Sequence, residues 1–125
     1  EEAITALRSA LALYAGDYLP EALYEDWAAE QRERLLTLYL RAADRLADAL
    51  IERGQVEEGL DICQAILARD VCWEHAYQLM MSAYTRQGNR VQAHRIYARC
   101  VEVLRAELDV PPSAETLGLY RQLSG

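Results

Sequence analysis

Apolar side chains recur along most of this chain at the three- and four-residue spacing of an amphipathic helix. The apolar stretches are separated by single glycines or prolines, and the alternating pattern typical of a strand does not occur. The pattern therefore predicts an all-α protein of about six helices in antiparallel pairs. The expected helices cover residues 2–15, 21 or 25 to 53, 56–68, 73–87, 90–108 and 114–123.

Each helix is expected to bury one apolar stripe. On the long helix that ends at residue 53, the expected stripe is Leu35, Tyr39, Ala42, Ala43, Leu46 and Leu50. On the helix over 90–108, the stripe runs from Ala93 to Leu108. Cys63 and Cys100 fall on such stripes, so we expect both to be small core residues. We expect Trp27 to pack the first two helices together and residues 16–20 to form a structural corner.

Two glycines mark an internal repeat. Gly54 and Gly88 lie 34 residues apart, and Gly59 matches Ala93 at the same spacing. A helix–turn–helix unit of 34 residues is the signature of the tetratricopeptide (TPR) repeat. Glycine is favoured where the chain reverses after a helix, and a small residue five positions later lets the second helix approach the first. A plain helical bundle with coincident glycines is the alternative.

The repeat register predicts a candidate interaction surface. In TPR folds the first helix of each pair lines a concave groove, and aligning the two glycines places eight residues there. They are Arg41, Asp44, Asp48, Ile51, His75, Gln78, Ser82 and Thr85. Because this set is mixed and slightly acidic, we expect the groove to prefer a polar or basic segment. The groove lacks the Lys and Asn set with which co-chaperone TPR domains clamp a C-terminal carboxylate.

Composition narrows the possible functions. The chain has 125 residues, of which 52% are hydrophobic, which suits a single domain with its own core. A net charge of −7 argues against gripping phosphate backbones directly. All 13 basic residues are Arg, so a P-loop lysine and a Schiff base are excluded. No hydrolase or phosphate-loop motif occurs, so we expect no enzyme activity, no catalytic residue and no cofactor.

The cysteines and the apolar runs suggest where the protein works. The three cysteines form no CxxC motif, and no secretion signal or membrane-spanning run occurs, which together favour a reduced, cytoplasmic setting without membrane contact. Cys72 and His75 have the spacing of half a metal site. A structural zinc needs four ligands, and no second pair has matching spacing, so we expect no metal site.

Three motifs, in order along the chain, resemble the bacterial transcriptional activator domain (BTAD). The first is LYAGDYLP at residues 13–20, and the second is YEDW at 24–27 followed by EQRERL at 30–35. The third is ELDVPPSAET at 107–116, followed by Leu119 and Tyr120. The resemblance extends over nearly the whole chain, which we therefore take as one such domain over 1–125. It implies the all-α, TPR-like fold of this domain in SARP-type and EmbR-type regulators.

The same resemblance implies a role in transcription regulation without catalysis. Protein contacts would be its means, through self-association, RNA polymerase or a signalling protein. DNA would be bound only by an adjacent domain, commonly an OmpR-like winged helix on the N-terminal side. Because the chain begins with Glu rather than Met, we expect it to be a fragment of a larger regulator. The alternative is a free-standing TPR scaffold or co-chaperone that binds a peptide in its concave groove.

Overall fold

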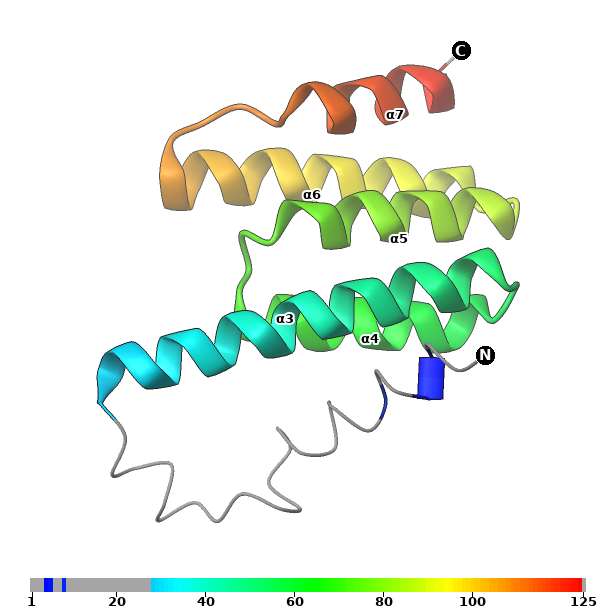
Figure 1. Cartoon of the computed structure of the whole chain (residues 1–125). Coiled ribbons are helices and arrows are strands. Elements are labelled where there is room, and N and C mark those ends of the chain that lie inside the picture. The colour runs from blue at the N-terminus through cyan, green and yellow to red at the C-terminus, as the bar shows by residue number, and fades with distance from the viewer. Residues whose placement is uncertain (1–3, 6–7, 9–27, 125) are drawn as a thin grey trace.

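The computed structural model describes residues 4, 5, 8 and 28–124, and within them the chain is helical with no strand. The prediction of an all-α, TPR-like fold is confirmed, with five helices in this part against about six expected for the whole chain. The helices are α3 (Ala29–Glu52), α4 (Val56–Arg69), α5 (Glu74–Arg86), α6 (Arg90–Leu108) and α7 (Ala114–Ser124) (Figure 1). Of the predicted helix over 2–15, residues 4, 5 and 8 are described and are helical, whereas the corner at 16–20 and Trp27 lie outside the described residues.

The helices form antiparallel hairpins that stack on one another. α3 packs on α4 and α5 packs on α6, as the repeat predicts (Figure 1). The first helices of successive units also lie side by side, because α3 contacts α5, and α5 contacts α7. None of the helices in the described ranges is long and apolar enough to cross a membrane.

The two hairpin turns have the same backbone geometry. Gly54 and Gly88 both adopt the left-handed conformation, with φ of 87° and 75°. The amide after each glycine donates back into the helix, from Gln55 to Leu50 and from Asn89 to Tyr84, over 2.8 Å in both turns. This is the Schellman arrangement that ends a helix at a glycine. A Cβ at either glycine would meet nothing within 4 Å, so the positive φ, and not lack of space, requires glycine.

The small residues of the repeat lie at the contact between paired helices. Gly59 and Ala93 are buried, as expected. A Cβ at Gly59 would lie 2.5 Å from Cγ1 of Ile51. Cys63 and Cys100 also belong to the core, and burial raises the pKa of each thiol to about 12. Both cysteines are therefore core residues, as the pattern predicted.

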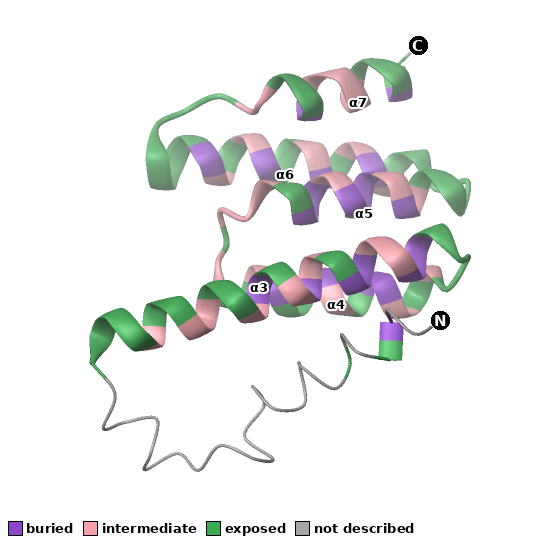
Figure 2. Cartoon of the chain, viewed as in Figure 1, coloured by how far each residue is buried: buried purple, intermediate pink, exposed green. Residues whose placement is uncertain are grey.

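The prediction of the buried stripe on α3 was partly wrong. Ala43, Leu46 and Leu50 are buried, whereas Leu35, Tyr39 and Ala42 are only half-buried. The other buried side chains on α3 are Leu40, Ala47 and Ile51. The reason is that α3 packs against both α4 and α5, so a wider band of its surface is covered than one stripe (Figure 2).

Other segments of the chain cover the outer surfaces of the first and the second hairpin. Ile4 is buried against Leu46 and Leu50, so the beginning of the chain contacts α3. At the other end, α7 packs on α5 and α6. Leu108, expected in the core, is instead 57% exposed, because it is the last residue of α6 and the chain turns away at Asp109 with a φ of 54°.

Candidate functional site

The predicted interaction residues occupy neighbouring helices. Arg41, Asp44 and Asp48 lie on α3, and the predicted residues after residue 70 lie on α5 beside it. Three residues of the set are exposed and four are half-buried. The exposed ones are Arg41, His75 and Thr85, and the half-buried ones are Asp44, Asp48, Gln78 and Ser82.

Ile51 is the exception in this set. Its side chain is 1% exposed and packs in the core against Gly59 of α4. It therefore offers no surface to a ligand, although the repeat register placed it in the groove. The repeat register predicts which turn of α3 a residue occupies, but it does not show whether another helix covers the side chain. At Ile51, α4 covers it.

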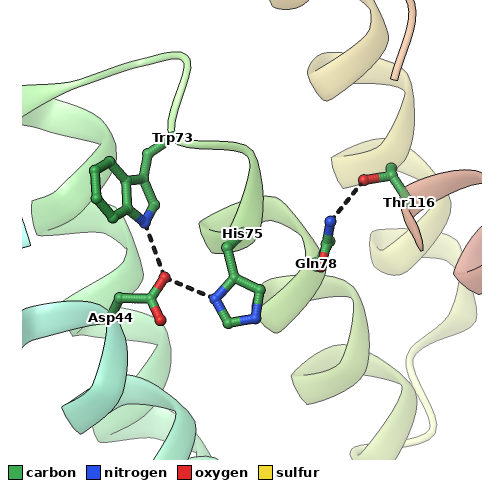
Figure 3. A network of polar contacts seen from close by, with 5 residues as sticks. All are labelled: Asp44, Trp73, His75, Gln78 and Thr116. Carbon is green, nitrogen blue, oxygen red and sulfur yellow. Dashed lines mark hydrogen bonds and ion pairs between the residues drawn. The ribbon is translucent and has the colours of Figure 1, made fainter. Parts of the chain in front are cut away.

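Asp44 joins the first hairpin to the second. Its Oδ2 accepts hydrogen bonds from the indole Nε1 of Trp73 over 2.8 Å and from Nδ1 of His75 over 2.7 Å (Figure 3). Because a carboxylate only accepts, the proton of this pair lies on the His75 ring. Trp73 comes from the loop between α4 and α5, and His75 from the first turn of α5. One carboxylate thus ties the start of α5 to α3.

These contacts change the proton affinities of both partners. Burial would raise the pKa of Asp44, but the hydrogen bonds from His75 and Trp73 and the charge of His75 outweigh it, so this pKa is lowered. The hydrogen bond to Asp44 raises the pKa of His75, against the lowering effect of burial. The His75 side chain is 45% exposed and that of Asp44 is 15% exposed, so the pair lies at the edge of the surface.

Gln78 makes the corresponding connection one repeat later. It stands 34 residues after Asp44, and its Nε2 donates to Oγ1 of Thr116 on α7 over 3.0 Å (Figure 3). Thr116 in turn donates to Oε2 of Glu74 over 2.5 Å. The same carboxylate oxygen accepts from the backbone amide of Ser113 over 2.7 Å. Burial would raise the pKa of Glu74, but these hydrogen bonds outweigh it and lower the pKa.

An open cavity of about 420 Å³ lies beside the Asp44 contacts. We call it the junction cavity, because both hairpins contribute to it. Its lining consists of Arg41, Asp44, Arg45, Trp73, Glu74 and His75. The indole of Trp73 gives it an aromatic part, and all of its other lining side chains carry or can carry charge. Such a cavity can hold a short polar segment or a single charged side chain.

Two further predicted residues line a separate cavity between α5 and α7. Ser82 and Thr85 line it together with Arg86 and Arg90, and its volume is about 260 Å³. Both arginines already have carbonyl partners, because Arg86 donates to Ile51 O over 3.3 Å and Arg90 to Leu123 O over 2.8 Å. These arginines join helix ends together, which leaves less of their donor capacity for a ligand.

One member of the half metal site suggested by Cys72 and His75 has another partner, because Nδ1 of His75 bonds Asp44. Cys72 is half-buried and its thiol forms no disulfide. Across residues 4, 5, 8 and 28–124, no three His, Cys, Asp or Glu side chains come together as a metal site would require.

Sequence reasoning missed three residues of this site. Trp73, Arg45 and Glu74 line the junction cavity, yet none of them was assigned to the groove. Trp73 and Glu74 lie where the second unit begins, and the loop length decides where their side chains point. Arg45 is the residue of the three that the sequence could have indicated. It follows Asp44 directly, and a cavity at the edge of the groove is lined by neighbours of the groove residues as well as by those residues themselves.

The fold and this surface define an all-α helical-repeat domain of TPR-like hairpins, with a polar surface along its first helices. The comparison with protein families specifies the class further. The sequence model described as the bacterial transcriptional activator domain matches residues 1–124, and the chain belongs to this family. No curated protein and no solved structure matches the chain. This match confirms the resemblance seen in the sequence motifs. The family consists of regulatory domains associated with transcriptional activators.

Proposed function

We propose that this chain is a non-catalytic protein-interaction domain of a bacterial transcription regulator. The observation that carries the proposal is the family match over residues 1–124. The surface along the first helices supports an interaction role, because Arg41, His75 and Thr85 are exposed on it.

The domain acts by self-association of the regulator or by contact with RNA polymerase or a signalling protein. Promoter recognition belongs to a separate domain, since a net charge of −7 is unfavourable for direct binding to a phosphate backbone. The cytoplasmic location that we propose follows from this role, because bacterial promoter DNA lies in the cytoplasm.

The proposal is tested by measuring promoter binding and transcription separately. Removal of residues 1–124 from the regulator is expected to abolish activation of a reporter gene while promoter binding by the separate domain persists. Activation that continues without this domain would contradict the proposal. Light scattering after size exclusion, over a concentration series of this chain, then decides the mode of contact. A stable dimer favours self-association, and a monomer at every concentration favours a foreign partner.

A further inference from the structure

The junction cavity contains two cations that have no partner in the part of the chain that the structure describes. Arg41 and Arg45 lie one helical turn apart on α3, and both are exposed. Within residues 28–124, neither guanidinium forms a hydrogen bond or an ion pair. Each guanidinium presents five N–H donors in a planar fork that fits a carboxylate. The cavity therefore has a large unused capacity to donate hydrogen bonds.

The acidic residues of the same cavity are already engaged. Oδ2 of Asp44 accepts from Trp73 and His75, and Oε2 of Glu74 accepts from Thr116 and Ser113. A basic side chain entering the cavity would meet two free guanidinium groups and would compete with these internal donors for the carboxylates. A single ligand carboxylate meets no internal competitor at Arg41 and Arg45, provided that it lies on the arginine side of the cavity, away from the charged Asp44 and Glu74.

We propose that the junction cavity binds an acidic segment of a partner protein, with a ligand carboxylate between Arg41 and Arg45 and an apolar neighbour against Trp73. This inference rests on the proposed function, because it names the chemistry of the partner for the same surface. It is opposite to the expectation from sequence, which counted Asp44 as a charge available to a basic ligand.

The surroundings favour an acidic peptide over a nucleic acid. A nucleic acid carries one phosphate per nucleotide, and its neighbouring phosphates would approach Asp44, Glu74 and the nearby Asp48 on α3. A peptide can place one carboxylate between the arginines and put an apolar residue next to it. A Trp wall beside a pair of Arg side chains is typical of the anchoring points of protein interfaces.

The test measures, by fluorescence anisotropy, binding of a fluorescein-labelled peptide that carries a single Glu next to a Leu in an otherwise uncharged Gly/Ser sequence. The control peptide carries Gln in place of this Glu. The double variant Arg41→Gln/Arg45→Gln removes the two free cations, and Arg95→Gln/Arg99→Gln on the exposed side of α6 removes the same net charge elsewhere. We expect the first variant to bind the Glu peptide about tenfold more weakly or worse, and the second less than about twofold more weakly.

Three results would overturn the inference. They are equal binding by the two double variants, equal binding of the Gln peptide, and tighter binding of a single-stranded oligonucleotide than of the Glu peptide. All four arginines are exposed, so we expect both double variants to fold. Melting curves of each variant check this. If the regulator with Arg41→Gln/Arg45→Gln still activates its reporter and the Glu peptide never binds, the ligand assignment fails while the proposed function stands. The proposed function fails only if deletion of the whole domain leaves activation intact.

Discussion

Gly59 offers a direct test of the helix packing in the first hairpin. A Cβ at this position would lie 2.5 Å from Cγ1 of Ile51 and 3.2 Å from the carbonyl oxygen of Ala47. Ile51 is β-branched and 1% exposed, so its side chain has neither another favourable rotamer nor open space to enter. The change Gly59→Ala adds about 1 kcal/mol of helix propensity but overpacks the contact at about 1–3 kcal/mol. We expect a net loss of about 1 kcal/mol in the free energy of unfolding.

The assay is urea unfolding of four proteins that form a double-mutant cycle. Ile51→Ala alone should cost about 2–5 kcal/mol, because it leaves a cavity in the core. In that background Cγ1 of Ile51 is gone and the 3.2 Å approach to the Ala47 carbonyl oxygen remains, so Gly59→Ala should cost at least about 1 kcal/mol less than it does in the parent protein. The matched control is Gly118→Ala on α7, where a Cβ meets nothing within 4 Å. It should raise stability by about 0.5–1 kcal/mol.

The difference in the cost of Gly59→Ala between the two backgrounds supports or refutes the reasoning. If Gly59→Ala destabilises the protein equally with and without Ile51, the cost does not come from the contact with Ile51. If it stabilises the parent protein, α3 and α4 have room to separate and the small residue is not required. An unchanged denaturant dependence of the unfolding free energy must accompany each comparison, because it shows that the same surface is exposed on unfolding.

Three further predictions test other parts of the fold. Ala93→Arg should unfold the domain or lower its melting temperature severely, because Ala93 is 0% exposed between helices; an unchanged melting temperature would show that the repeat register is wrong. His75→Gln should reduce stability most between pH 3.8 and 6.5, the usual pKa values of Asp and His. The stabilisation from the His75–Asp44 pair is lost as the pH rises through the raised pKa of His75 in the folded protein. It is also lost as the pH falls through the lowered pKa of Asp44 in the folded protein. A difference in melting temperature between the two proteins that does not vary with pH would contradict this. Thr116→Val should cost about 1–3 kcal/mol in urea unfolding, because the buried hydroxyl donates to Glu74; a loss below about 0.5 kcal/mol would show that water replaces it.

Much of the fold could be predicted because its signals are local. The turn at Gly54 and the turn at Gly88 need a left-handed residue, and glycine is the residue that adopts this conformation without strain. The small residues at Gly59 and Ala93 are likewise visible in the sequence. The exposure of Leu108 could not be predicted, because it depends on whether another helix covers the end of α6, and the apolar pattern does not show this.

The sequence predicted which helices carry the candidate site, but not which of its side chains form hydrogen bonds with one another. The repeat register placed Asp44, His75 and Gln78 on neighbouring first helices, which is where they lie. The bonds from Asp44 to His75 and from Gln78 to Thr116 cross 31 and 38 residues, which are not the repeat period. Such pairings depend on loop length and on the distance between stacked hairpins, so periodicity alone could not reveal them.

The sequence by itself determined the helices, the hairpin turns and the family of this protein. Those properties depend on residues close together in the chain or on motifs read in order. Only the tertiary structure decided that Ile51 is buried, that Asp44 accepts from Trp73 and His75, and that Arg41 and Arg45 have no partner among the described residues. Whether a charge is available to a ligand depends on which side chains from other hairpins reach it within hydrogen-bond distance, and this distance is a property of the packed fold.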